Sequence, residues 1–143
     1  MKICKLSDSF YTDYPLSKYP ELMSKPTRPY LILIAVIDGV TYGIPFRSNC
    51  HHRYAYKFHD SDRTTDSYTC LDFSKAIKIL KNSYIGESAM VDAKEYHNLL
   101  EKEHFVISRF KHFLSLFEKV MKDPNKYPDD YRRLKYSTLN YFC

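Results

Sequence analysis

The chain has 143 residues, which suits one domain, and 44% of them are hydrophobic, which excludes a disordered chain. Its longest apolar run, residues 31–37, is far shorter than the roughly 20 residues that a membrane-spanning helix needs. The formal net charge of +5 favours a polyanionic partner. We therefore expect a single domain over residues 1–143 and no membrane segment.

The first third of the chain is predicted to form strands. Lys2 to Leu6 fits a short strand. Prolines limit any helix between Tyr11 and Lys25 to a short piece that starts near Pro15 or Pro20. The stretch from Tyr30 to Ile37 is apolar and rich in β-formers, so we expect a central strand with both faces covered.

A hairpin is predicted at Asp38-Gly39. Both residues tolerate positive φ, and this dipeptide between two β-rich runs is the strongest short-range hairpin signal. The second strand is expected over Val40 to Phe46. Pro45 has no N–H to donate, so we expect this strand to end or bulge there. The residues after Pro45 are therefore predicted at a strand end, on a rigid scaffold.

The following segment mixes loops and a strand. His59 to Ser67 is polar and is predicted to be a loop. Ala76 to Leu80 fits another strand, and Asn82 to Glu87 fits a turn.

The last third is predicted to be helical. Asp92 followed by Glu95 resembles a capping box, and no Gly or Pro occurs from there until Pro124. We expect two helices with a break near Glu103-His104, and a short terminal helix within residues 127–142. Apolar residues at helical spacing mark one buried face: Val106, Phe110, Phe113, Leu114, Phe117 and Met121. The order of the elements, with strands first and helices after them, predicts an α+β fold with helices packed on a curved antiparallel sheet.

The sequence lacks the motifs of several common enzyme classes. There is no phosphate-binding glycine loop, no G-x-S-x-G and no H-E-x-x-H. The cysteines Cys4, Cys50, Cys70 and Cys143 form no C-x-x-C pair or zinc spacing. The N-terminus lacks a secretory apolar segment. We therefore expect a cytoplasmic protein with free thiols, no metal ion and no cofactor.

Residues 46–57 combine the groups that phosphodiester chemistry needs. Arg47 can hold a phosphate through two parallel hydrogen bonds, and Ser48 can donate another. His51 or His52 can move protons near neutral pH. These groups suit RNA cleavage by the 2′-hydroxyl, which needs a base, a cation beside the phosphorane and an acid for the leaving oxygen.

Tyrosine is abundant, with 14 in the chain and no tryptophan. Tyr54 and Tyr56 alternate, so they are predicted to share one face of a short strand, where aromatic rings could stack on unpaired bases. Lys75 is a second catalytic candidate, although it also fits a surface lysine or a partner of Asp72. The acidic pair Asp129-Asp130 is expected to be solvated beside a turn.

The quoted segments together resemble a known family. "YGIPFRSNCHH" followed by "CLDFSKAIKI", with the Tyr-Pro segment near the N-terminus and the closing "YSTLNYF", resembles the ToxN/AbiQ family of type III toxin–antitoxin endoribonucleases, and most closely its TenpN- and CptN-like branches. The resemblance implies a compact, highly bent antiparallel sheet wrapped by helices, similar to the MazF/Kid toxins.

The resemblance also implies a function. Such toxins are metal-independent, sequence-selective endoribonucleases that leave 2′,3′-cyclic phosphate and 5′-hydroxyl ends. A small RNA pseudoknot inhibits them as an antitoxin, which they process from a repetitive precursor, and toxin and RNA alternate in closed assemblies. The systems act in abortive infection by phage. The implied partners here are therefore an antitoxin RNA and target RNA.

The resemblance assigns roles to particular residues. It places Arg47, Ser48, His51, His52 and Lys75 in the catalytic set. We expect RNA to be bound by Arg28, Tyr30, Arg53, Tyr54, Tyr56, Lys57 and Ser74. Many relatives carry lysine where this chain has His51. If His51 takes over the role of that lysine, activity should fall at higher pH, because only the lysine stays charged there.

Two alternatives stay open. The same cations could position an RNA backbone without cutting it, in a non-catalytic RNA-binding protein. The tyrosines could instead serve a protein interface in a structural domain. RNA binding that weakens with salt would separate the first from the second.

Overall fold

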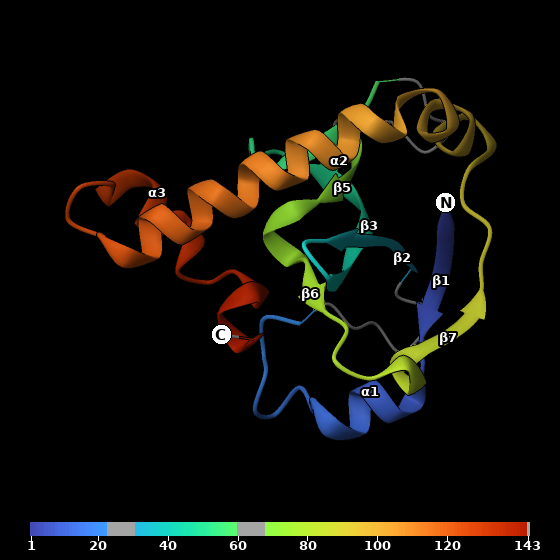
Figure 1. Cartoon of the computed structure of the whole chain (residues 1–143), viewed down its shortest axis with the longest axis horizontal. Coiled ribbons are helices and arrows are strands. Elements are labelled where there is room, and N and C mark those ends of the chain that lie inside the picture. Colours follow the sequence, from blue (N-terminus) through green and yellow to red (C-terminus); the bar gives the residue numbers. More distant parts are fainter. Residues whose placement is uncertain (23–30, 60–67, 143) are drawn as a thin grey trace.

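The computed structural model describes residues 1–22, 31–59 and 68–142. Within them the fold is α+β, with a seven-stranded antiparallel sheet in the order β4-β5-β3-β2-β1-β7 and β6 paired to β3 (Figure 1). The strands are β1 (Lys2–Leu6), β2 (Leu31–Ile37), β3 (Val40–Cys50), β4 (Ala55–Phe58), β5 (Tyr68–Asp72), β6 (Ile77–Lys78) and β7 (Ile85–Ser88). The α-helices are α1 (Asp8–Asp13), α2 (Ala93–Lys122) and α3 (Pro128–Leu134), and short 3-10 helices are η1 (Phe73–Lys75), η2 (Asn82–Tyr84) and η3 (Thr138–Phe142).

The predicted hairpin is confirmed. Asp38 and Gly39 have φ angles of 51° and 78°, as a type I′ turn requires at both of its central residues. They join β2 to β3 in continuous register from Ile37 and Val40 onwards.

The prediction that the second strand ends or bulges at Pro45 is wrong. Pro45 is the last residue of β3 that pairs with β2, opposite Ile32, and the strand then continues as far as Cys50 by pairing with β5. The missing N–H of Pro45 is tolerated because the ladder to β2 stops there. The irregularity lies further along, between Arg47 and Cys50, where Asn49 has a φ of 59°.

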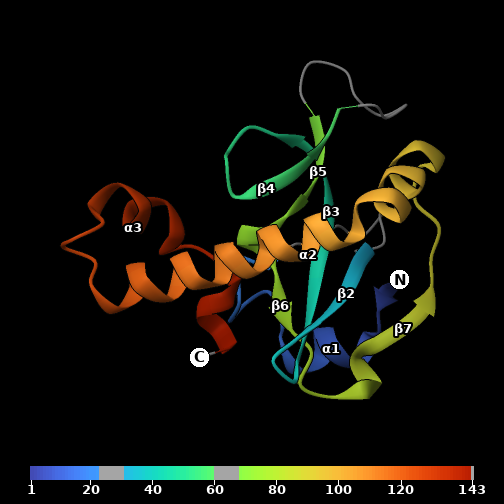
Figure 2. The same ribbon diagram turned by 45° about the horizontal axis from the view of Figure 1, so that its top comes forward.

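Strand β2 is central and buries both faces, as its apolar sequence predicts. Leu33, Ala35 and Ile37 join the core cluster that α2 covers, whereas Ile32 joins a second cluster with Phe10 of α1. Val36 is the exception, at 64% exposed. Figure 2 shows α2 lying across one face of the sheet.

One continuous helix replaces the two helices predicted after Asp92. The expected break near residues 103–104 is absent, because no Gly or Pro interrupts the segment and its buried face continues from Leu99 through Val106 to Val120. Asp92 caps α2 by accepting hydrogen bonds from the N–H groups of Lys94 and Glu95, as predicted. The helix ends at Lys122, just before Pro124.

Other boundaries differ from the predictions. Helix α1 ends before Pro15 instead of starting near it, because the proline disfavours helical geometry at Tyr14, which has φ −123° and ψ 67°. Strand β6 covers only two residues of the predicted 76–80, and β7 occupies part of the predicted turn. Most of the predicted loop at 59–67 lies outside the described residues.

The C-terminal region forms α3 with proline at its first position, followed by η3, where one short helix was expected. No helix in the described part of the chain has the length and apolar character needed to cross a membrane.

Candidate functional site

The sheet formed by β4, β5 and β3 has one face on the core beneath α2, and a second face that carries polar side chains beside the small buried cluster of Cys50, Ala55 and Cys70. Cys70 lies opposite Lys57 on one side and Arg47 on the other, and directly paired residues point to the same face. Asp72 follows Cys70 by two residues and therefore shares that face. The alternate row of Phe46, Leu71 and Tyr56 belongs to the core beneath α2. Two cations and a carboxylate thus project from the face opposite α2.

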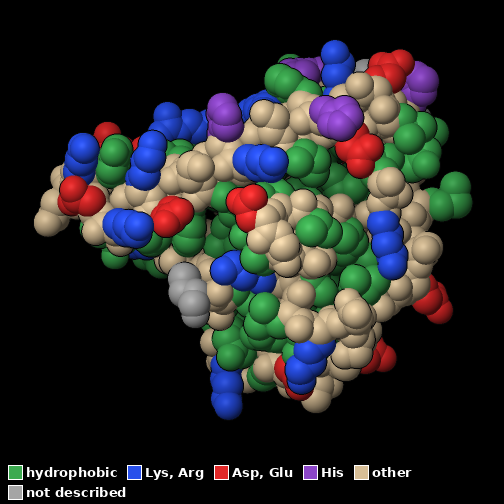
Figure 3. Space-filling model, in the orientation of Figure 1, with side chains coloured by type: hydrophobic (Ala, Val, Ile, Leu, Met, Phe, Trp, Pro, Cys, Tyr) green, Lys and Arg blue, Asp and Glu red, His purple; other side chains and the backbone are tan. Residues whose placement is uncertain are grey.

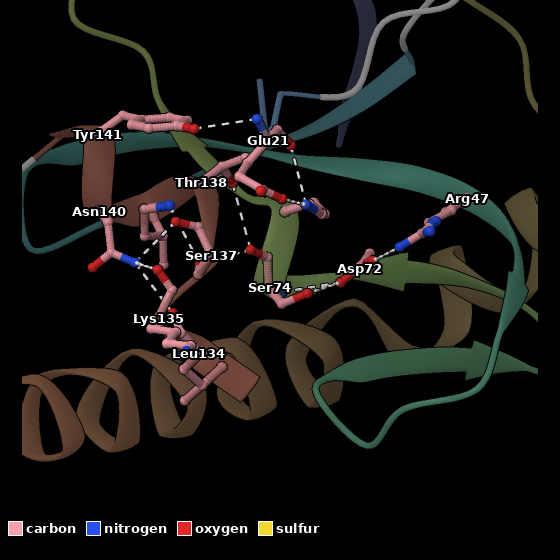
Figure 4. A network of polar contacts seen from close by, with 12 residues as sticks. Glu21, Arg47, Asp72, Ser74, Leu134, Lys135, Ser137, Thr138, Asn140 and Tyr141 are labelled. Carbon is pink, nitrogen blue, oxygen red and sulfur yellow. Dashed lines mark hydrogen bonds and ion pairs between the residues drawn. The ribbon is translucent and has the colours of Figure 1, made fainter. Parts of the chain in front are cut away.

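Asp72 is the centre of a hydrogen-bonded cluster, although it was not predicted as a site residue. It ends β5 and is fully buried. Its Oδ2 accepts from Arg47 Nη1 at 2.9 Å and pairs with His52 Nε2 at 3.2 Å. Its Oδ1 accepts from the N–H and hydroxyl of Ser74 at 3.0 and 2.6 Å (Figure 4). Three predicted site residues therefore meet on one carboxylate.

The surroundings keep Asp72 ionised. Burial is the largest single influence and would raise the pKa of Asp72. Favourable interactions with His52, then with Ser74 and Arg47, together outweigh it, so the pKa of Asp72 lies below its ordinary value. The cluster therefore carries a carboxylate at neutral pH, matched to the guanidinium of Arg47.

Arg47 combines a fixed side with an open side. One of its five N–H donors bonds to Asp72, while 40% of the side chain is exposed. The remaining donors could bind an anionic ligand such as a phosphate. Ser48 and Asn49 follow at the irregularity of β3, and Ser48 is half-buried.

The adjacent histidines occupy different environments. His52 Nδ1 accepts from the backbone N–H of Tyr54 at 3.1 Å, and Nε2 lies against Asp72. Because a backbone amide can only donate, Nδ1 carries no proton, and the proton of the neutral ring lies on Nε2 and points at the carboxylate. His51 is exposed. The structure thus brings His52 into the cluster and leaves His51 at the surface.

Lys75 lies in a neighbouring network. Its Nζ donates to a carboxylate oxygen of Glu21 at 3.0 Å and to the Glu21 carbonyl at 3.1 Å, so Glu21 takes the place suggested for Asp72. The Glu21 N–H donates to the Tyr141 hydroxyl. Ser137 donates to the Ser74 carbonyl at 2.6 Å (Figure 4). The three segments that carry the family resemblance besides the hairpin are therefore in contact.

Arg53 and Tyr54 pair with Asp130. The Asp130 carboxylate accepts from the Tyr54 hydroxyl and from Arg53, and these hydrogen bonds, Tyr54 first, lower the pKa of Asp130 against a smaller effect of burial. The expectation that both acids of Asp129-Asp130 are solvated is therefore wrong for Asp130. The side chain of Asp129 is 86% exposed.

The tyrosine prediction is half confirmed. Tyr54 and Tyr56 share a face, because their rings contact Phe113 and Phe105 of α2 respectively. That face is the core face, however, and the residues are only 5% and 8% exposed. Their rings fill the core instead of offering a surface to bases, so the predicted stacking role is corrected.

The cysteine prediction is also corrected. Cys50 and Cys70 form a disulfide with a Cα–Cα distance of 6.1 Å, which joins β3 to β5 in a small buried cluster with Ala55. Cys4 is a buried free thiol, and Cys143 lies outside the described residues. Over the described ranges, no group of three or more His, Cys, Asp or Glu side chains could hold a metal ion.

Asp72 could have been found in the sequence. Asp followed two residues later by Ser is a common turn in which the carboxylate accepts the later N–H, and it interrupts an otherwise apolar run. Glu21 and Asp130 gave no such signal, because their partners Lys75 and Tyr54 lie 54 and 76 residues away. Arg28 and Tyr30 lie outside the described residues.

The surface seen in Figure 3 carries mixed charge. Lys and Arg side chains are spread along α2 and α3, with acidic side chains between them. This face therefore displays no continuous basic groove. Lys57, on the opposite face of the sheet, is half-buried.

Comparison of the chain with protein-family models, with curated proteins and with solved structures found no match. The functional interpretation therefore depends on the residues of the chain and their geometry.

Proposed function

We propose that the chain is a metal-independent endoribonuclease that cuts RNA by attack of the 2′-hydroxyl on the adjacent phosphate. A bond forms between the 2′-oxygen and phosphorus, the bond to the 5′-oxygen breaks, and the proton of the 2′-hydroxyl passes through the site to the leaving oxygen. The products are a 2′,3′-cyclic phosphate and a 5′-hydroxyl. One observation carries the proposal: Arg47 and His52 lie on one buried carboxylate, on a face that also carries Lys57.

The proposed roles follow from exposure and charge. The open N–H groups of Arg47 bind the scissile phosphate and stabilise the charge that develops on the phosphorane. Lys57 contacts the RNA backbone on the same face. Ser48 adds a hydrogen bond, and the exposed imidazole of His51 exchanges protons with the reacting oxygens.

The biological part of the proposal depends on the resemblance to the ToxN/AbiQ family. The protein would be the toxin of a type III system, with a MazF-like bent sheet, inhibited by a pseudoknot RNA that it processes. Toxin and RNA would form a closed assembly in the cytoplasm and act against phage by abortive infection.

The first test is incubation of the purified protein with a long transcript in EDTA. We expect cleavage, with cyclic phosphate on the upstream fragment and hydroxyl on the downstream fragment, because the proposed groups need no metal ion. RNA that stays intact but is bound in a salt-dependent way would favour the non-catalytic RNA-binding protein instead.

The second test is Arg47→Ala. We expect cleavage to slow by about 100-fold to 1,000-fold, the usual loss when one stabilising donor is removed, and RNA affinity to fall as well. Arg132→Ala is the matched control, because Arg132 is an exposed arginine on α3 in a surface pair with Asp129. Equal effects of the two substitutions would show that Arg47 has no special role.

A further inference from the structure

We infer that Asp72 and His52 are positioning residues, which hold Arg47 toward the substrate phosphate, and that His52 does not itself transfer the proton. This inference rests on the proposed function. It adds Asp72 to the site and separates the two histidines, which the sequence left as equivalent candidates.

The first argument is the saturation of His52. Its Nδ1 accepts from the Tyr54 N–H at 3.1 Å and its Nε2 donates to Asp72 at 3.2 Å. A general base needs a free lone pair directed at the substrate, and a general acid needs a proton directed there. Both ring nitrogens of His52 are directed at protein atoms instead.

The second argument is that Asp72 connects three elements. It receives Arg47 from β3, His52 from the segment between β3 and β4, and Ser74 from η1. Oδ2 is shared by Arg47 and His52, so a displacement of either side chain disturbs the other. A misplacement of about 1 Å in a catalytic group can cost about 100-fold in rate.

Substitutions that do not titrate can separate positioning from proton transfer. In His52→Gln the amide nitrogen can still donate to Asp72, and in His52→Asn the amide oxygen can still accept from Tyr54. Neither side chain can exchange a proton near neutral pH. His52→Ala removes both contacts. Asp13→Asn is the control, because the Asp13 carboxylate lies on α1 and accepts a hydrogen bond from Tyr84, which belongs to the second core cluster.

The experiment measures single-turnover cleavage of one transcript between pH 5 and pH 9. We expect His52→Gln or His52→Asn to retain activity within about tenfold of the unmodified protein, with the same pH profile, while His52→Ala and Asp72→Asn lose about 100-fold. The inference is overturned if Gln and Asn are as inactive as Ala and one limb of the pH profile disappears, because His52 would then be the proton carrier.

A second readout is independent of activity. Imidazole nitrogen NMR reports which ring nitrogen carries the proton, and the His52→Gln spectrum identifies the His52 signals. We expect the Nε2–H form in the unmodified protein and a changed signal in Asp72→Asn. An unchanged signal would exclude the Asp72 contact. If no RNA is cut, the proposed function fails while this readout still decides whether Asp72 orients His52.

Discussion

Asp72 has no exposure to solvent, yet it holds a negative charge inside the protein. Burying an unpaired carboxylate is strongly unfavourable, so the charge on Asp72 is stable only because hydrogen-bond donors surround it. Four donor atoms from Arg47, His52 and Ser74 lie within 3.2 Å of its two oxygens. The Asp72 carboxylate therefore organises the site, and it contributes to the stability of the fold only while it is ionised.

This arrangement predicts a pH-dependent contribution to stability. Because folding lowers the pKa of Asp72, its contribution is complete above the ordinary aspartate pKa of about 4 and is lost as the pH falls below that value. We expect Asp72→Asn to lower the free energy of unfolding by about 2 kcal/mol at pH 7, and the difference from the unmodified protein to shrink toward pH 3.

Urea unfolding at several pH values measures this difference. Asp129→Asn is the control, because Asp129 is exposed and its surface ion pair with Arg132 is expected to contribute less than about 1 kcal/mol at any pH. A difference for Asp72→Asn that stays constant down to pH 3 would contradict the assigned charge.

At the scale of elements, the contact between β3 and β5 carries the site. Arg47 pairs with Cys70, and the register then shifts before Cys50 pairs with Tyr68. The disulfide between Cys50 and Cys70 crosses this shift and fixes the irregular segment that includes Ser48 and Asn49. Disulfides are rare in the cytoplasm, so the proposed location and this pairing lead to opposite expectations for the thiols inside cells.

Thiol counting resolves the two expectations. The disulfide takes up two of the four cysteines, so we expect two thiols to react in denaturant after purification without reductant. Four reactive thiols would mean that the pair is not formed. Rapid alkylation during cell lysis measures the number of reactive thiols in the protein as it exists inside cells.

The disulfide also predicts a stability effect. It closes a segment with a sequence separation of 20, so reduction should lower the free energy of unfolding by roughly 3 kcal/mol. Thermal unfolding with and without a dithiol reductant measures this loss. Cys50→Ala is the control, since its melting temperature should not respond to reductant.

At the scale of the whole molecule, the sheet separates two cores, and the C-terminal segment connects them to the site. Phe142 joins the cluster that contains Phe10, whereas Leu139 joins the cluster beneath α2. Between these clusters the buried Thr138 donates to the Ala76 carbonyl at 2.6 Å. The residues after Asp72 are therefore held by the end of the chain.

This connection predicts that a distant hydroxyl affects the site. Thr138→Val keeps the shape but removes the donor to Ala76, so we expect a loss of about 1–3 kcal/mol in the free energy of unfolding and slower cleavage. Thr12→Val on α1 is the control, because the Thr12 hydroxyl bonds within its own exposed helix. Equal stability of the Thr138 variant and the unmodified protein would contradict the connection.

Local patterns predicted much of the fold. The Asp38-Gly39 turn, the cap at Asp92 and the end of α2 before Pro124 each depend on neighbours in sequence, and the structure has them as expected. The predicted strand end or bulge at Pro45 and the predicted break in α2 are wrong, because pairing with β5 and packing against the core decide those points.

The features of the site can likewise be separated into those that the sequence determined and those that depend on the tertiary structure. The sequence determined which chemical groups follow the hairpin, because composition and spacing are properties of the chain itself. Only the tertiary structure decided that Arg47 and His52 meet at Asp72, that Lys75 pairs with Glu21, and that the tyrosines face inward. Contacts between residues 20 to 54 positions apart depend on strand register and on which face is buried, and no local pattern specifies either.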